Sequence, residues 1–237
     1  MCIEGQVAVI AGGEGALGRA VTQEFLSRGA NVFVGWNSDE EWGQAKALIP
    51  VELKDRIADM RVDLTEEDQV VAFIEKARQR FGTVDVLLHM VGMISIGRPL
   101  WETDAAVLDK LIDVNLKSAF LSAKHALKIM IEKNSGRIFF FPASVVLEPK
   151  PGFGAYAISK SGLLTLTEAL REELKDTAIT VNSVMFSVLD TPKTRKMPGA
   201  QPEKYVAPAE VAKLLAMLCS DRSGAVSGSV LKLYGKL

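Results

Sequence analysis

Short apolar segments alternate with amphipathic helical segments along the chain, and this alternation constrains the fold more than any other feature. Apolar segments of strand length lie at 7–10, 32–34, 60–62, 84–88, 137–141, 180–184 and 229–234. Helical patterns separate them at 17–28, 40–48, 66–80, 104–131, 155–175 and 208–219. Repeated strand–helix units predict a parallel sheet with helices on both faces. We therefore expect a doubly wound α/β fold.

The length of 237 residues suits a single domain of this class. Linkers, low-complexity tracts and internal repeats do not interrupt the pattern, and the Pro/Gly-rich pieces at 149–154 and 191–208 are short enough to be loops beside a site. We predict one Rossmann-type domain spanning 1–237.

The composition points to a small-molecule partner. Lys plus Arg (28) and Asp plus Glu (29) nearly cancel, so the charge pattern argues against nucleic acid as a partner. Apolar runs fall short of the roughly 20 residues that cross a bilayer, and the N-terminus lacks a basic leader. Cys2 and Cys219 are far apart, which indicates neither a metal cluster nor a disulfide framework. We expect a cytoplasmic protein without a metal or a membrane partner.

A glycine-rich turn follows the first strand and opens the first helix. Gly13, Gly15 and Gly18 have the G-x-G-x-x-G spacing, whose missing side chains let backbone N–H groups approach a pyrophosphate at a helix N-terminus. The same spacing also occurs in tight turns that bind nothing. Its place directly after the first strand favours a dinucleotide site.

The end of the second strand leaves the choice between NAD and NADP open. Dinucleotide folds commonly place an acidic residue there for the ribose of NAD, or a basic one for the phosphate of NADP. This chain has Trp36, Asn37 and Ser38, whose polar atoms can serve either cofactor. Glu14 in the glycine turn would repel a phosphate, so we lean slightly to NAD.

Tyr156 and Lys160 form a Y-x-x-x-K pair on one helix face. A tyrosine with a pKa of about 10 needs a decrease of roughly 3 units, or ~4 kcal/mol, to act as a base near neutrality. An ammonium about 4 Å away supplies ~4 kcal/mol at an effective dielectric of about 20. The spacing alone also fits an ordinary surface pair, but its place after the fifth strand of a strand–helix array favours catalysis.

These motifs together resemble the short-chain dehydrogenase/reductase superfamily, including its 3-oxoacyl-[acyl-carrier-protein] reductase-like members, over nearly the entire chain. The family turn T-G-x-x-x-G-x-G is in register with Gly12 and Gly18, while Ala11 and Ala16 depart from it. The resemblance implies an NAD(P)-dependent oxidoreductase that interconverts a carbonyl and a secondary alcohol by hydride transfer. Tyr156 would be the general acid/base, and Lys160 would lower its pKa and hold the nicotinamide ribose.

The same resemblance implies further site residues. Asn115 matches the helix asparagine that anchors a water for proton relay. Asp63 matches an adenine-contacting aspartate, although a helix N-cap before Glu66 fits it equally well. Thr191 would contact the nicotinamide carboxamide or a phosphate, at the start of a substrate loop over about 191–207. The other expected cofactor contacts are Leu17, Leu64, Val91, Gly92 and Leu189.

Several departures from the family pattern leave an alternative open. The family serine aligns with Ala143, and Ser144, one position later, is expected to substitute for it. The family N-N-A-G is His89-Met90-Val91-Gly92 here. We interpret His89 as structural, and we assign no role to His125 on a helix that looks exposed. The alternative is a catalytically impaired dinucleotide-binding relative, but the retention of Tyr156, Lys160 and Asn115 favours an enzyme.

Assembly is a further expectation from the resemblance. Members of the family often pair the long helices that here span 104–131 and 155–175, which predicts a dimer or homotetramer. Leucines suited to such an interface are Leu163, Leu164, Leu166 and Leu170. They would equally well cover the sheet within one subunit.

Overall fold

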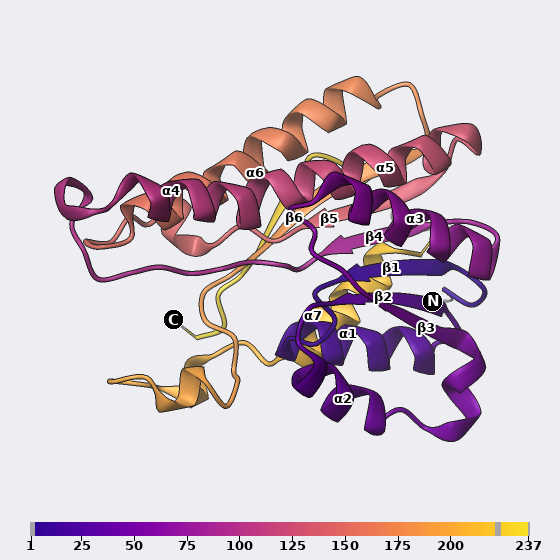
Figure 1. The fold of residues 1–237 in the computed structure, drawn as a ribbon, viewed down its shortest axis with the longest axis horizontal. Coiled ribbons are helices and arrows are strands. Elements are labelled where there is room, and N and C mark those ends of the chain that lie inside the picture. Colours follow the sequence, from indigo (N-terminus) through magenta and orange to yellow (C-terminus); the bar gives the residue numbers. More distant parts are fainter. Residues whose placement is uncertain (1–2, 221–223, 237) are drawn as a thin grey trace.

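The computed structural model describes residues 3–220 and 224–236, and it contains one parallel sheet of seven strands (Figure 1). The order across the sheet is β3-β2-β1-β4-β5-β6-β7. The strands are β1 (Val7–Ala11), β2 (Asn31–Trp36), β3 (Ile57–Arg61), β4 (Val86–His89), β5 (Gly136–Phe140), β6 (Ile179–Phe186) and β7 (Val230–Leu233). The structure confirms the predicted doubly wound α/β fold.

Helices cover both faces of the sheet (Figure 1). One layer consists of α1 (Ala16–Ser27), α2 (Asp39–Ala47) and α7 (Pro208–Leu218). The other consists of α3 (Glu67–Phe81), α5 (Ser118–Glu132) and α6 (Gly154–Glu173), with α4 (Ala105–Ile112) leading into α5. Both layers form because strands buried on two faces need apolar cover on each side.

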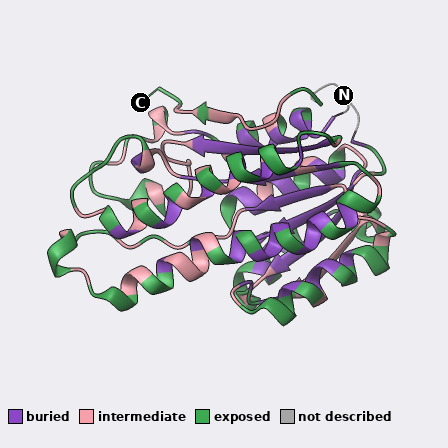
Figure 2. Ribbon diagram, turned by 90° about the horizontal axis from the view of Figure 1, so that it is seen from above, coloured by how far each residue is buried: buried purple, intermediate pink, exposed green. Residues whose placement is uncertain are grey.

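The alternation of side chains along β1 divides the core into two halves. Ala8 and Ile10 pack in the half that contains Phe25 of α1, whereas Val9 and Ala11 pack in the half that contains Phe73 of α3. Figure 2 shows the central strands and the helix surfaces that face them as buried, whereas the edge strands β3 and β7 are mostly intermediate. The reversal of strand order between β1 and β4 opens a crevice at the carboxyl ends of these strands, the usual ligand position in such sheets.

Two elements depart most from prediction, while the other strands and helices begin and end within two residues of it. The third strand begins at Ile57, three residues before the predicted apolar segment, and Val62 lies just past its end. The predicted helix over 104–131 is interrupted by a π turn at Asp113–Lys117, where the Ser118 N–H bonds to the Asp113 carbonyl five residues back. Turns of this kind are frequent at functional sites, and this one carries Asn115.

The structure decides between the two roles left open for Leu163 and Leu170. Both are buried in the core, so they cover the sheet of their own subunit. One side-chain expectation is corrected. His125 is buried rather than exposed, and its Nε2 lies 2.8 Å from Glu67 Oε1 of α3. Within the described residues, no helix is long and apolar enough to cross a membrane, and no cluster of His, Cys, Asp and Glu is suited to a metal ion.

Candidate active site

The glycine turn between β1 and α1 has close backbone packing that only glycine permits. Gly12 has a φ of 88°, in the left-handed region. A Cβ at Gly13 would lie 2.1 Å from Val34 Cγ1, and one at Gly18 would lie 2.3 Å from the Gly12 carbonyl oxygen. At Gly15 the nearest atom is 3.6 Å away, and Ala16 is an exposed first residue of α1. Gly12, Gly13 and Gly18 are therefore the glycines that the turn requires.

A cleft of about 450 Å³ lies beside this turn, at the carboxyl ends of β1, β2 and β4. Its volume falls within the usual range for ligand pockets. Eight of the expected cofactor-binding residues line it, namely Gly12, Glu14, Trp36, Asn37, Asp63, Leu64, Val91 and Gly92. The turn and the cleft together fit a dinucleotide.

Ten residues of the cleft were not among the individually predicted cofactor contacts, although Gly15 belongs to the predicted glycine turn. They are Gly15, Gly35, Glu41, Val62, Thr65, Met90, Met93, Lys110, Val114 and Ser118. Most adjoin predicted positions at strand ends. Lys110, Val114 and Ser118 are spaced four residues apart along one predicted helix, and this spacing is a signal that could have identified them.

Seven of the expected cofactor residues are not among those that line the cleft, namely Ala16, Leu17, Gly18, Tyr156, Lys160, Leu189 and Thr191. Leu17 is buried in the core, with Gly18 buried beside it under the turn. Leu189 packs against the same core and bridges to Val206. The structure therefore gives the side chains of Leu17 and Leu189 a packing role.

Glu14 reaches from the glycine turn to the end of β2. Its Oε1 accepts a hydrogen bond of 2.9 Å from the Asn37 backbone N–H. Its Oε2 is buried and has no hydrogen-bond partner among the described residues. A buried carboxylate oxygen without a partner is costly, and it is an acceptor ready for a ligand hydroxyl.

Asp63 supports a turn rather than a helix end. Its Oδ1 accepts hydrogen bonds from the Thr65 backbone N–H at 3.0 Å and the Thr65 hydroxyl at 2.7 Å. These bonds hold the pKa of Asp63 below its usual value. Because α3 begins at Glu67 with Glu66 at its N-cap, Asp63 is not the N-cap of that helix. Its position in the cleft lining is compatible with an adenine contact.

Lys160 and Asn115 converge on Gly92 at the other end of the cleft. Lys160 is buried, and its Nζ donates to the Phe141 carbonyl at 3.2 Å. A Cβ on Gly92 would lie 2.8 Å from Lys160 Nζ and 3.2 Å from Asn115 Oδ1. A side chain at position 92 would displace the Lys160 ammonium, so the glycine leaves room for the lysine and the asparagine beside the loop that follows β4.

The Asn115 side chain ties three segments together. Its Oδ1 accepts from the Met93 N–H at 2.7 Å, and its Nδ2 donates to the Met93 carbonyl at 2.9 Å and to Ser159 Oγ at 2.9 Å. Both amide hydrogens are engaged, so the side chain itself acts as a clamp between the loop after β4 and α6. This clamp explains why the predicted long helix contains a π turn at this residue.

The structure corrects the expected electrostatics of Tyr156. Burial raises the pKa of Tyr156 to about 12 instead of lowering it. The ammonium of Lys160 bonds to a carbonyl oxygen, and burial lowers the pKa of Lys160 to about 8. The loss of water around the phenol thus dominates over the lysine charge in this structure. Tyr156 is protonated at neutral pH, which is the form a general acid requires.

Ala143 and Ser144 occupy the segment that follows β5. Ala143 forms an isolated bridge with Phe186, and Ser144 opens a short 3₁₀ turn at Ser144–Val146. The half-buried Ser144 hydroxyl has no hydrogen-bond partner within the described part of the chain, so it is free to donate to a substrate oxygen.

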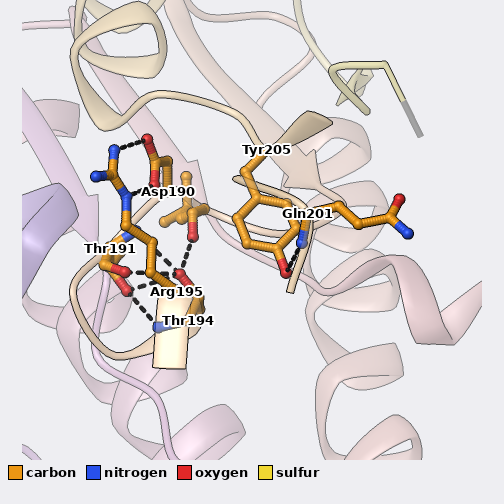
Figure 3. A network of polar contacts seen from close by, with 7 residues as sticks. Asp190, Thr191, Thr194, Arg195, Gln201 and Tyr205 are labelled. Carbon is orange, nitrogen blue, oxygen red and sulfur yellow. Dashed lines mark hydrogen bonds and ion pairs between the residues drawn. The ribbon is translucent and has the colours of Figure 1, made fainter. Parts of the chain in front are cut away.

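The expected substrate loop is ordered at its start by a polar network (Figure 3). The Thr191 N–H and hydroxyl lie 2.9 and 3.0 Å from Thr194 Oγ1, which also donates to the Leu189 carbonyl at 2.6 Å. Arg195 bonds to both carboxylate oxygens of Asp190, at 2.5 and 2.6 Å. Thr191 thus stabilises the first turn of the loop, and it lines a separate surface depression with Asp190 and Arg195.

Comparisons with known proteins agree with this fold. The sequence profile of the family described as short chain dehydrogenase matches residues 6–201. The 3-oxoacyl-[acyl-carrier-protein] reductase of Thermotoga maritima is 31% identical over 100% of this chain and 99% of its own. The cis-4-hydroxycyclohexanecarboxylate dehydrogenase of Sinomonas cyclohexanicum is 30% identical over 97% of this chain and 95% of its own.

Solved structures extend the likeness to three dimensions. A short-chain dehydrogenase/reductase from Serratia marcescens superposes with a TM-score of 0.89 at 24% identity, covering 100% of this chain and 99% of its own. The NADP-bound structure of ElxO gives a TM-score of 0.89 at 25% identity, with 97% of each chain covered.

The chain belongs to the short-chain dehydrogenase/reductase family. It is an NAD(P)-dependent oxidoreductase, similar over its whole length to 3-oxoacyl-[acyl-carrier-protein] reductases.

Proposed function

We propose that this enzyme interconverts a carbonyl and a secondary alcohol, with Tyr156 as the general acid/base. The supporting observation is that Lys160 and Asn115 converge on Gly92, which lines the cleft. Lys160 lies one helical turn after Tyr156 on α6. A bound nicotinamide cofactor supplies or accepts the hydride. In reduction, the protonated phenol of Tyr156 donates its proton to the substrate oxygen, while the Lys160 ammonium holds the nicotinamide ribose.

The relatives suggest a substrate panel. Their names mention a 3-oxoacyl-[acyl-carrier-protein], a cis-4-hydroxycyclohexanecarboxylate and a 3β-hydroxysteroid. We propose a small-molecule substrate from the wider class of ketones and secondary alcohols, tested by following NADH or NADPH absorbance across these three groups. Turnover of any one supports the proposal. Tight cofactor binding without turnover across the panel would instead support a catalytically impaired relative. The observation that favours this alternative is Ala143, which stands in place of the family serine.

Ser144 is proposed to polarise the substrate carbonyl. We expect Ser144→Ala to lower kcat by about 10²- to 10³-fold, because an aimed donor stabilises developing charge on oxygen. The matched variant is Ala143→Ser, which restores a hydroxyl at the family position. Steady-state kinetics of both variants separates the two positions. An unchanged Ser144→Ala together with a faster Ala143→Ser would show that Ser144 has no such role.

NAD is proposed as the preferred cofactor. The unpartnered Oε2 of Glu14 is an acceptor for a ribose hydroxyl at the corner that contains Asn37. Three carboxylates line the cleft, from Glu14, Glu41 and Asp63, against the single lining lysine, Lys110. The guanidinium of nearby Arg19 already donates to the carbonyl oxygens of Glu14 and Glu41. A 2′-phosphate would therefore add negative charge to an acidic corner.

The preference for NAD should depend on the charge of Glu14. We expect the wild-type protein to bind NADH at least about tenfold more tightly than NADPH, and Glu14→Gln to reduce this ratio by about that factor. Trp36 lines the cleft, so quenching of its fluorescence follows the titrations with NADH and with NADPH. Glu40→Gln on α2, which removes the same charge outside the cleft lining, is the control. A wild-type preference for NADPH, or an unchanged ratio in Glu14→Gln, would refute the assignment.

Assembly, loop function and location complete the proposal. The large apolar side chains exposed on the two long helices are Phe120 and Ile131 of α5 and Ile158 of α6, and they support a dimer or homotetramer through these helices better than the buried Leu163 and Leu170 do. Sedimentation velocity measures the assembly.

We propose 1–237 as one catalytic domain in the cytoplasm, with residues 191–207 closing over the substrate and Thr191 near the nicotinamide.

A further inference from the structure

Asp59 is a carboxylate within the edge strand β3 that the proposed chemistry does not use. Its Oδ1 accepts a hydrogen bond of 2.9 Å from the indole N–H of Trp36, the last residue of β2. Its Oδ2 accepts from Lys46 Nζ of α2 at 2.5 Å. The side chain of Asp59 is only 16% exposed. One carboxylate, bonded on both oxygens, therefore joins β2, β3 and α2 at one edge of the sheet.

Asp59 is ionised at neutral pH. Burial acts to raise the pKa of this carboxyl group, but the hydrogen bonds from Lys46 and Trp36 outweigh it and hold the pKa below its usual value. Hydrogen bonds to an ionised acceptor are about twice as strong as neutral ones. The Lys46 side chain is 55% exposed, so its ion pair with Asp59 contributes little. The local structure therefore depends mainly on the bond from the half-buried Trp36.

Trp36 begins the segment that lines one end of the cleft. Trp36, Asn37 and Glu41 all belong to the cleft lining, whereas Asp59 does not. The Asn37 N–H donates to Glu14 of the glycine turn at 2.9 Å. The segment after β2 is thus held by the glycine turn on one side and by β3 on the other. Any effect of Asp59 on a bound cofactor passes through the residues that it holds.

The helix after this segment, α2, packs with a small apolar surface. Two of its nine residues are buried, Trp42 and Ala45. Its Asp39 pairs with Arg61 of β3 at 3.3 Å, but both side chains are exposed, and exposed ion pairs are weak. With so little apolar contact, the corner between β2 and α2 depends on the polar bond from the end of β2 to β3.

We propose that Asp59 is a positioning residue for the cofactor: by holding the indole of Trp36, it fixes the corner of the cleft that takes the adenosine half of the dinucleotide. This inference rests on the proposed function, in which Glu14 and the end of β2 face the adenosine ribose. Because Asp59 lies outside the cleft lining, its effect is on cofactor binding and not on the chemical step. A nicotinamide ligand without adenosine should be indifferent to it.

The indole resonance of Trp36 tests the bond in the free protein, without cofactor or turnover. The chain has three tryptophans, and Trp36→Phe assigns the signal. We expect the Trp36 Nε1 proton to exchange with solvent more slowly than that of Trp101, which is 85% exposed. Asp59→Val, which removes the acceptor and suits a strand, should speed this exchange at least about tenfold, and Asp59→Asn, which keeps an acceptor oxygen, should restore most of the protection. Equal exchange in wild type and Asp59→Val would overturn the proposal.

Calorimetric titration with matched ligands tests the consequence for binding. NADH and NADPH contain the adenosine half, and reduced nicotinamide mononucleotide lacks it. We expect Asp59→Val to weaken binding of the preferred dinucleotide about tenfold, and to leave binding of the mononucleotide within about twofold of wild type. At saturating dinucleotide, kcat should also stay within about twofold, so that the loss appears in KM. A merely structural defect would weaken both kinds of ligand equally, and that result would overturn the proposal.

Two further variants show whether Asp59 acts through Trp36. In the Trp36→Phe background, the added change Asp59→Val should alter dinucleotide affinity by less than about twofold, because the bond is already absent. Asp39→Asn is the matched control, since it removes the same charge from the exposed pair with Arg61, outside the cleft lining. It should leave the affinity unchanged. Additive effects at positions 36 and 59, or an equal loss in Asp39→Asn, would contradict the proposed role.

The remaining outcomes separate this inference from the proposed function. If Asp59→Val does not fold, Asp59→Ala removes the same acceptor without a branched side chain on β3 and takes its place in every titration. A wild-type protein that binds a dinucleotide but turns over no ketone or secondary alcohol would refute the proposed reaction, while the titrations would still judge Asp59. A wild-type protein that binds both dinucleotides no more tightly than the mononucleotide would overturn the inference, whatever its turnover.

Discussion

Replacing Tyr156 with phenylalanine is expected to reduce kcat by about 10²- to 10⁴-fold, the usual contribution of a positioned general acid or base. The structure indicates that the rest of the protein should be unaffected. The Tyr156 hydroxyl has no hydrogen-bond partner among the described residues, and the ring would be retained. Cofactor affinity should therefore stay within about twofold of wild type, and the loss should fall on the chemical step.

The measurement compares kcat with the dissociation constant for NADH in the same preparations. Tyr234→Phe is the matched control, since its hydroxyl contacts Met185 Sδ at 3.5 Å, away from Lys160 and the cleft. The control should keep wild-type turnover. If Tyr156→Phe retained more than about a tenth of the wild-type rate, Tyr156 would not be the proton donor.

Replacing Gly18 with alanine should weaken cofactor binding at least about tenfold and destabilise the fold by about 1 to 3 kcal/mol. The new methyl group would lie 2.3 Å from the Gly12 carbonyl oxygen and 2.6 Å from Gly13 Cα. Both neighbours are backbone atoms, so the turn must move as a unit. That movement would displace the N–H groups that face the pyrophosphate.

Gly15→Ala is the matched control in the same turn. Its backbone φ of −69° and ψ of 163° suit any residue, and its added methyl would meet no atom closer than 3.6 Å. We expect a change of less than about 1 kcal/mol in stability and little change in NADH affinity. Chemical denaturation and fluorescence titration measure both quantities. Equal effects of the two substitutions would contradict the steric account of the turn.

The sequence predicted the sheet and its helices because burial on both faces leaves a strong local pattern of apolar strands and amphipathic helices. It also predicted which side of the sheet would carry the site, since the glycine turn identifies the carboxyl end of β1. Eight predicted cofactor residues lie along one cleft for the same reason. Boundaries were less accurate: β3 begins at Ile57, where pairing with Val32 starts before the apolar segment does.

The roles of individual site residues depended on contacts between distant segments. Local spacing could not show that Asn115 clamps Met93, that His125 is buried against Glu67, or that Leu163 belongs to the core. Glu14 was identified by its charge, but its unpartnered oxygen became visible only with β2 beside it. The π turn at Asp113–Lys117 likewise follows from a clamp across elements rather than from helix propensity.

The sequence by itself determined the order of elements, the glycine turn and the pairing of Tyr156 with Lys160 on one helix face. Tertiary structure decided their electrostatics. Helical spacing brings the phenol and the ammonium to the same face, but burial raises the pKa of Tyr156 and lowers that of Lys160. Desolvation is set by every segment that excludes water from a group, and those segments come from β4, β5 and the π turn, which the sequence of α6 does not contain.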